Sequence, residues 1–212
     1  MKEMPKRRKI ARPGEILAAA LAEFEAKGFA DTTFADIAKR AGIARATIYL
    51  YFDSKDRIFD ALTRRILTDP LEEMGQALDA YDGTSEALLE RFLTHLHSEA
   101  SEAETILLLR ILVSEGRRFP DLVRLHHARI NDSGLSLLQR IIRRGIDRGE
   151  FAPEIADLDL RVVIAPAIMA LFWQMIFASI APLDREAMLR SHLDLVLRSL
   201  RPVPAFAPSG MG

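Results

Sequence analysis

The feature that most constrains the fold is the spacing of apolar residues, which follows a helical repeat of three to four residues along most of the chain. In the stretch EILAAALAEFEAKGF, one apolar stripe runs from Ile16 to Phe24 and ends before Gly28, a residue that commonly terminates helices. No stretch alternates apolar and polar residues as a half-buried strand does. We therefore expect an all-α protein.

Residues that begin and end helices divide this pattern near the N-terminus. Thr33 and Asp36 have the spacing of a capping box, which predicts a short helix from about Phe34 to Ala41. Gly42 interrupts the pattern, and a second short helix is expected from about Ala44 to Tyr51. Asp53 or Ser54 then begins a further helix.

The rest of the chain also has a helical pattern. We expect helices to begin at Ser85, at Ser101 with Glu104 as its capping-box partner, and at Asp184. A long helix is predicted over Pro120–Arg148, weakened at Gly134. The tail from residue 202, rich in Pro, Gly and Ala, has no periodicity and is expected to be disordered.

The segment from Val162 to Ile180 has 19 uncharged residues, nearly the length of a membrane span. Pro166 and Gln174 interrupt it, and amphipathic helical patterns flank it on both sides. A helix that is apolar on all sides can also be buried against protein, so we expect it at a subunit interface and not in a membrane. The basic N-terminus lacks the apolar stretch of a secretory signal, which favours a cytoplasmic protein.

The charges are divided unevenly along the chain. Residues 1–65 contain 14 Lys and Arg against 9 Asp and Glu, whereas the remainder contains 15 against 21. A basic front and an acidic back predict two lobes with different partners, the front one polyanionic. Chance on a charged surface is the alternative explanation.

The stretch IAKRAGIARATIYLYF, residues 37–52, has three basic residues and no acid. Small residues and Gly42 allow two short helices to cross closely, while Ile37, Ile43 and Ile48 are placed inward. The exposed side of the second helix then fits a DNA major groove, where Arg bonds guanine and Thr meets a thymine methyl group. The side chains on that exposed side would be Arg45, Thr47, Tyr49, Leu50 and Tyr51.

From Ile16 to Leu62, the chain resembles the DNA-binding domain of the TetR family of bacterial transcriptional regulators. The motifs that carry the resemblance include FEAKGF, the Thr33 cap, AGI, TIY, YF and SK. The resemblance implies an all-helical homodimer with two N-terminal DNA-reading heads and a larger lobe for ligand sensing and dimerisation. It also implies that Arg45 and Thr47 face bases. The residues implied to hold phosphates are Thr33, Tyr49, Tyr51 and Lys55.

Several positions leave alternatives open. Ala44 stands where the family often has Ser or Thr, so the recognition helix lacks a side-chain cap. Leu50, often polar in the family, would touch a thymine methyl group or simply pack. Tyr49 has a core aromatic as its alternative role, and the core is preferred for Phe52 and Ile48. The basic arm KRRK with Arg12 would follow the minor groove or remain a solvated tail.

The expected organisation is a basic arm over residues 1–12, a helix-turn-helix domain over 13–54, a ligand-sensing and dimerisation domain over 55–201, and the tail over 202–212. The dimer would pair the Pro120–Arg148 region and the last helix with their mates. Arg110 would pair with an acid inside the protein or with an anionic ligand. It is therefore one of the expected pocket residues. The others, each with plain core as the alternative, are Phe92, Leu96, Leu109, Val113, Asn131, Trp173 and Phe177.

These features favour a sequence-specific repressor that binds a palindromic operator in double-stranded DNA and is released by a small-molecule effector. An activator, or a ligand-independent regulator of the same fold, is the alternative. An enzyme is not expected, because the chain has no Cys, no Gly-rich phosphate loop and no supported nucleophile. No cofactor or metal is expected, since neither His95 and His97 nor His126 and His127 have the spacing that chelates a metal on a helix.

Overall fold

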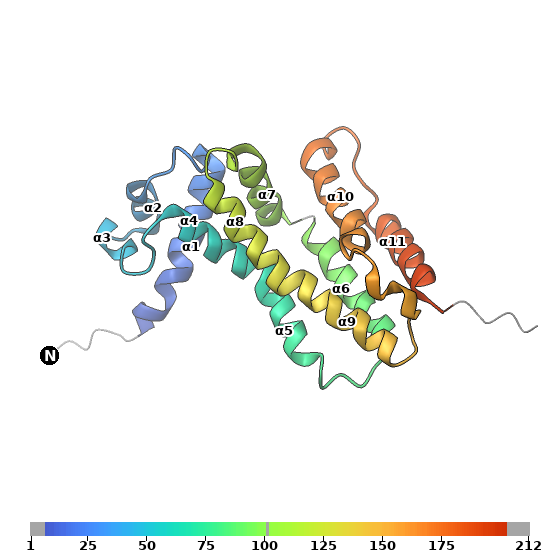
Figure 1. The fold of residues 1–212 in the computed structure, drawn as a ribbon. Coiled ribbons are helices and arrows are strands. Elements are labelled where there is room, and N and C mark those ends of the chain that lie inside the picture. Colours follow the sequence, from blue (N-terminus) through green and yellow to red (C-terminus); the bar gives the residue numbers. More distant parts are fainter. Residues whose placement is uncertain (1–6, 101, 203–212) are drawn as a thin grey trace, which may run out of the picture. The chain divides into compact units, whose positions relative to one another are not determined.

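The computed structural model describes residues 7–100 and 102–202, with side chains from Pro13 onward. Within these residues every element is helical, as predicted (Figure 1). The elements are α1 (Arg7–Lys27), α2 (Phe34–Ala41), α3 (Arg45–Ile48), α4 (Lys55–Thr63), η1 (Arg64–Thr68), α5 (Asp69–Ala77), α6 (Ser85–Glu99), α7 (Ala103–Glu115), α8 (Pro120–Arg129), η2 (Ile130–Leu135), α9 (Ser136–Asp147), η3 (Pro153–Asp157), α10 (Arg161–Phe177) and α11 (Arg185–Leu200).

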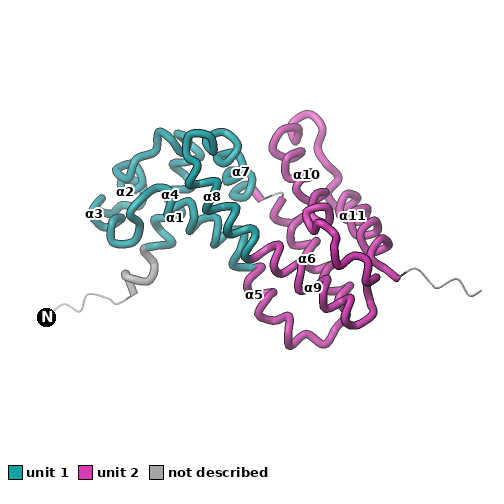
Figure 2. The backbone as a smooth tube through the Cα atoms, viewed as in Figure 1, with its two compact units in different colours: residues 1–70, 103–132 teal, residues 71–102, 133–212 magenta. Residues whose placement is uncertain are grey.

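These helices form two compact units (Figure 2). Unit 1 comprises Met1–Pro70 and Ala103–Asp132, so α7 and α8 join the N-terminal helices. Unit 2 comprises Leu71–Glu102 and Ser133–Gly212. The N-terminal head is thus packed with a segment that lies far from it in the sequence.

The core of unit 1 connects the head to α7 and α8. Phe29 follows α1 and packs edge-on against Phe59 of α4 and Phe119, with ring centroids 6.0 and 5.2 Å away. Ile48 of α3 and Leu122 of α8 are fully buried in the same core. The burial of Ile48 confirms the inward position that the sequence predicted.

The core of unit 2 lies between α6 and α9. Phe92 of α6 is buried there with Leu138 and Ile141 of α9. The apolar side of α9 is therefore used within the chain, although the Pro120–Arg148 region was expected to pair with its mate in a dimer. Phe151 belongs to the same core, and its ring leaves no room for a side chain at Gly145.

The helix starts are partly as predicted. Ser54 caps α4 and Asp184 caps α11, each accepting a bond from a backbone amide three residues later. The prediction of Ser85 as a cap is wrong, because Thr84 accepts the bond from the Ala87 amide and Ser85 is buried inside the first turn. Ser101 lies outside the described residues.

The predicted helix over Pro120–Arg148 begins at Pro120, and its path contains the wide π-helical turns of η2 around Gly134. Similar turns form η1 between α4 and α5. No described helix combines the length and apolarity needed to cross a bilayer. α1 begins at Arg7, within the predicted arm, and the arm side chains and residues 203–212 lie outside the described part.

Candidate functional site

The turn between α2 and α3 is shaped by local backbone bonds. Thr33 and Asp36 form the predicted capping box at the start of α2. At its end Gly42 adopts a left-handed conformation with φ of 66°, which favours glycine. The amide of Ile43 donates to the carbonyl of Ala38 at 3.0 Å, closing the helix end and directing the chain into α3.

α3 is shorter than predicted, with Arg45–Ile48 helical and the next three residues in tight turns. The amide of Tyr51 donates to the carbonyl of Ile48 at 2.9 Å, a bond across three residues and not four. Ala44 supplies no side-chain cap, and β-branched and aromatic residues have modest helix propensity. These two facts explain the early end of the helix.

The residues that the sequence placed on the outer side of the second helix differ in exposure. Arg45 is exposed, Thr47 is partly buried, and Leu50 is 79% exposed. That exposure excludes the packing alternative for Leu50 within this chain. Tyr49 is 50% exposed, so it is not a core aromatic, although one side of its ring is covered.

Tyr49 lies between a buried ring and a charged side chain. Its ring centroid is 4.9 Å from that of Phe34, the first residue of α2. Nη2 of Arg45 donates to the Tyr49 hydroxyl at 2.9 Å, and the guanidinium carbon lies 5.6 Å from the Tyr49 ring centroid. Phe34, Tyr49 and Arg45 therefore form a column, from the core to the exposed side of α3.

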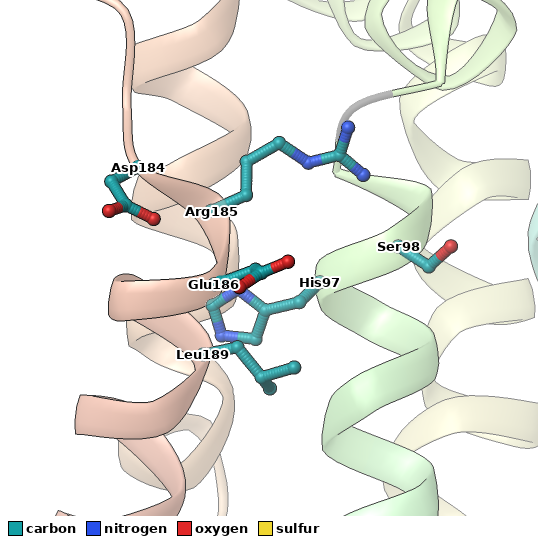
Figure 3. A pocket seen from close by; sticks show the side chains of 6 residues that line it. All are labelled: His97, Ser98, Asp184, Arg185, Glu186 and Leu189. Atoms are coloured by element: carbon teal, nitrogen blue, oxygen red, sulfur yellow. The ribbon is translucent and has the colours of Figure 1, made fainter.

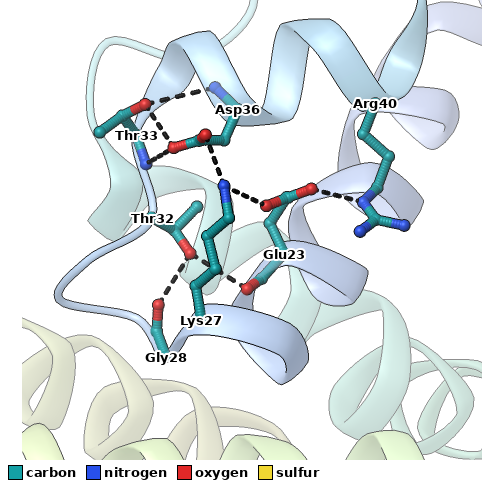
Figure 4. A network of polar contacts seen from close by, with 7 residues as sticks. All are labelled: Glu23, Lys27, Gly28, Thr32, Thr33, Asp36 and Arg40. Atoms are coloured by element: carbon teal, nitrogen blue, oxygen red, sulfur yellow. Dashed lines mark hydrogen bonds and ion pairs between the residues drawn. The ribbon is translucent and has the colours of Figure 1, made fainter.

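A chain of ion pairs ties α2 to α1 (Figure 4). Nζ of Lys27 lies 2.6 Å from Asp36 and 3.1 Å from Glu23, while Nε of Arg40 donates to Glu23 at 2.6 Å. The hydrogen bond from Lys27 lowers the pKa of Asp36 well below its usual range, and the hydrogen bonds from Thr33 lower it further. The network fixes the angle at which α2, and with it the turn to α3, leaves α1.

Two predicted phosphate contacts already have partners within the chain. The Thr33 hydroxyl donates to Asp36 at 2.6 Å while capping α2. The ammonium of Lys55 donates to the carbonyls of Phe29 and Ala30 at 2.6 and 2.9 Å. Partial burial lowers the pKa of Lys55. At this end of α4 the amide of Arg57 donates to Ser54, and the preceding amides of Lys55 and Asp56 are suited to a phosphate.

Residues far apart in the sequence tie α8 to the head. Arg129 of α8 donates two hydrogen bonds to Asp60 of α4, at 2.9 and 3.1 Å. Asp60 is nearly buried, and bidentate pairs of this kind have strict geometry. A displacement of α8 would therefore be transmitted to α4.

Unit 2 contains a cavity of about 580 Å³ between α6 and α11 (Figure 3). Its lining includes the buried His97, and Figure 3 shows Arg185 extending from α11 toward α6. Nε2 of His192 lies 2.8 Å from the Val163 carbonyl, and its Nδ1 lies 2.8 Å from Nε2 of His97.

This geometry sets the tautomers of the two neutral rings. A carbonyl only accepts, so Nε2 of His192 carries its proton and Nδ1 accepts from Nε2–H of His97. Burial lowers the pKa of both rings, that of His97 to about 4, with His192 as a second cause. Nδ1 of His97 is then left as an acceptor.

Two segments of the chain match models of known protein families. Residues 16–62 match the model of the bacterial regulatory proteins of the tetR family, and residues 81–196 match that of the tetracyclin repressor-like C-terminal domain. The chain belongs to the TetR family. It is a transcriptional regulator with a helix-turn-helix and not an enzyme, as the sequence predicted.

Among the relatives of this TetR regulator is YfiR of Bacillus subtilis, an HTH-type transcriptional regulator. The two are 31% identical over 156 residues, 71% of this chain and 73% of YfiR. The transcriptional repressor KstR2 of Mycolicibacterium smegmatis is 26% identical over 190 residues, 88% of this chain and 89% of the relative.

Solved structures share the fold of this TetR regulator. A SmeT–triclosan complex has a TM-score of 0.72 at 24% identity, covering 95% of this chain and 97% of SmeT. The regulator FadR of Bacillus subtilis, in complex with stearoyl-CoA, has a TM-score of 0.67 at 22% identity. That likeness covers 89% of this chain and 99% of FadR.

The residues predicted for the ligand pocket of this TetR regulator are divided between the units. Phe92, Leu96, Trp173 and Phe177 lie in unit 2, and Leu109, Arg110, Val113 and Asn131 lie in unit 1. The rings of Trp173 and Phe177 meet at a tilt of 55° with centroids 5.0 Å apart, and Trp173 donates to the Ala181 carbonyl, which stabilises the end of α10. Arg110 is exposed, so the buried charge that motivated its assignment is absent.

Sequence reasoning did not find His97 as a cavity residue, nor its pairing with His192 on another helix. It also did not find the contact between Arg45 and Tyr49, although their spacing of four residues places both on one side of a helix. That spacing was an available signal. No local signal pairs His97 with His192, 95 residues away.

Proposed function

We propose that this protein is a dimeric repressor that binds a palindromic operator and is released by a small amphipathic molecule. The main support for ligand-driven release is that α7 and α8 belong to the same compact unit as the head. A ligand that contacts α7 or α8 would displace the head through the Asp60–Arg129 pair and the Phe29–Phe119 contact. Such a ligand acts by binding the released state more tightly.

The surface around α3 supports the DNA-binding part of the proposal. It presents Arg45, Thr47, Tyr49 and Leu50 with no acid between residues 37 and 52. In this assignment Arg45 and Thr47 face bases, while Thr33, Tyr51 and the first-turn amides of α4 approach phosphates. Leu50 is placed to meet a thymine methyl group.

The apolar surface of α10 supports the dimer. Val162, Met169 and Ile176 recur every seven residues, which places them on one side of the helix, and all three are more than half exposed. Leu195 of α11 is 65% exposed. Large exposed apolar side chains in a row are typical of helix-to-helix interfaces, so α10 and α11 are the proposed interface helices.

An amphipathic ligand with a large apolar part is proposed from two similar solved structures and from the apolar residues of this chain. SmeT is solved with triclosan and FadR with stearoyl-CoA, and both ligands have a large apolar part. Two sites are candidates for this chain: the predicted residues Leu109 and Val113 of α7, and the cavity beside His97. The second offers a hydrogen-bond acceptor and a guanidinium next to an apolar Leu189.

The experiment is a gel shift on an operator selected from genomic fragments, titrated with triclosan and with stearoyl-CoA. Release of the operator by either compound supports the proposal. Arg129→Gln is expected to bind the operator and to respond less to the compound, whereas Arg143→Gln, at an exposed position on α9, is expected to respond like the unaltered protein. Tighter binding on addition of a compound would instead identify a ligand-dependent activator of DNA binding.

A further inference from the structure

The column of Phe34, Tyr49 and Arg45 joins the buried core of the head to an exposed residue that is proposed to face bases. Phe34 is buried and begins α2, next to the capping box of Thr33. Tyr49 lies on it at 4.9 Å, with the two ring planes at 57°. This tilted contact fixes one side of the Tyr49 ring, so the hydroxyl has a defined position although half of the residue is exposed.

The Tyr49 hydroxyl accepts a hydrogen bond from Arg45, and this restricts a side chain that would otherwise be mobile. Nη2 of Arg45 lies 2.9 Å from the hydroxyl oxygen, and the guanidinium lies over the Tyr49 ring at 5.6 Å. An exposed Arg has many rotamers, and ordering them opposes binding. A side chain that is already ordered before DNA arrives avoids that loss.

We propose that Tyr49 is a positioning residue that holds Arg45 for recognition of one base pair, which extends the proposed operator binding to a specificity-determining contact. The bond to Tyr49 uses one of the five guanidinium protons of Arg45. Two of the remaining donors reach O6 and N7 of guanine in the major groove. The base read at this position is therefore guanine.

This role differs from the phosphate contact that the family resemblance implied for Tyr49. A phosphate contact carries no sequence information, so its loss weakens binding to every operator variant by the same factor. Loss of a positioning contact weakens binding to the guanine operator and leaves operators with another base at that position little changed. The Tyr49 hydroxyl can accept from Arg45 and still donate its own proton. If its only role were to donate to phosphate, its loss would not depend on Arg45.

The test is a binding panel with the full-length protein and an operator selected for the unaltered protein. Each base pair of one half-site is changed in turn, and affinities are measured for the unaltered protein, Tyr49→Phe, Arg45→Ala and the double variant. Tyr49→Phe keeps the ring on Phe34 and removes only the hydroxyl. Tyr51→Phe is the matched control, because it removes a hydroxyl two residues away.

We expect Tyr49→Phe to lose about tenfold in affinity for the selected operator and to lose discrimination at one guanine position, the position that Arg45→Ala also affects. In the Arg45→Ala background, Tyr49→Phe should have no further effect. Tyr51→Phe should weaken all operator variants equally. Uniform loss in Tyr49→Phe, or additive losses in the double variant, would overturn the proposal.

Thermal unfolding of each variant guards against loss of fold. If Tyr49→Phe unfolds at a much lower temperature, Tyr49→Leu, which keeps an apolar side chain beside Phe34 and has no hydrogen-bonding group, is measured in its place, with the same position-specific loss expected. If the unaltered protein selects no sequence from the genomic fragments, the proposed operator binding fails. A protein that selects an operator but shows uniform losses in Tyr49→Phe refutes only the positioning role.

Discussion

Lys55 illustrates how the fold can use a residue that the sequence suggests for DNA. Its ammonium donates to two backbone carbonyls beyond α1 and lies 4.9 Å from the Phe29 ring centroid. Lys55→Met keeps the stem but leaves both carbonyls without this donor, so we expect unfolding free energy to fall by about 1–3 kcal/mol. Urea unfolding measures the change, with the exposed Lys39→Met as a control that should leave stability nearly unchanged.

The same variant separates a structural role from a phosphate contact. Because the ammonium is occupied within the chain, the salt dependence of operator binding should be unaltered in Lys55→Met. If the slope of log affinity against log salt concentration instead fell by about one, and stability were unchanged, Lys55 would bind a phosphate.

His97 and His192 make stability depend on pH. Burial lowers the pKa of His97 to about 4, below the value of about 6.5 in an unfolded chain. The unfolded state therefore binds more protons between these values, and unfolding free energy should be level above pH 7 and fall as pH drops from about 6.5 to 4. His126 is lowered to about 4 in the same way and contributes over the same range.

The variant His97→Gln tests this assignment by urea unfolding at several pH values. Its amide can still donate to His192 but does not titrate, so the fall between pH 6.5 and 4 should become shallower by up to about 1.4 kcal/mol per pH unit. An unchanged slope would contradict the contribution of His97. Asp159, whose pKa Arg161 lowers to about 2, titrates below this range.

Among helices α1 to α4, α3 is the shortest, with four residues, and its N-cap makes no side-chain hydrogen bond. Its first position follows Ala44, which is extended with φ of −71° and ψ of 142° and provides no cap. Ala44→Ser would place a hydroxyl where it can accept from a first-turn amide, so we expect a gain of about 0.5–1 kcal/mol in unfolding free energy. Ala46→Ser, inside α3, is the control and should not stabilise; equal effects of both variants would exclude capping as the cause.

The sequence predicted elements best where the determining bonds are local. The Thr33 cap, the left-handed Gly42 and the Asp184 cap each depend on residues within four positions. The sequence did not show which of two neighbours, Thr84 or Ser85, caps α6. Ser85 is bound instead by Arg144 and Glu150, about 60 residues away, and contacts at that distance have no local pattern. The early end of α3 follows from propensities that a boundary estimate weighs poorly.

For the molecule as a whole, the exposed stripe on α10 predicts that DNA binding depends on association. Met169→Glu with Ile176→Glu places two charges on that surface, so we expect light scattering to show a monomer and operator affinity to fall by at least about 100-fold. Gln139→Glu adds a charge on the exposed side of α9 and should leave both unchanged. A double variant that remains a dimer would place the interface elsewhere.

Contacts across the whole chain set the limit of prediction from the sequence. The helical class and the family could be predicted from periodicity and motif, as could the exposure of Arg45, Tyr49 and Leu50. The Asp60–Arg129 and His97–His192 pairs join residues 69 and 95 positions apart, and no spacing rule connects such residues. The prediction of ligand-binding residues was the weakest, because an apolar residue of the core and one that lines a pocket follow the same pattern in a sequence.

In the proposed dimer, the α3 helices of two protomers contact the two halves of a palindromic operator. The most direct measurement is selection from genomic fragments with the purified protein, followed by a gel shift at about 150 mM salt. We predict a short palindrome with half-site centres about 34–36 Å apart, bound with a dissociation constant of about 10⁻⁸ M or below. Weak binding that is equal for all sequences and fades steeply with salt would contradict the claim, because phosphate contacts alone would then account for it.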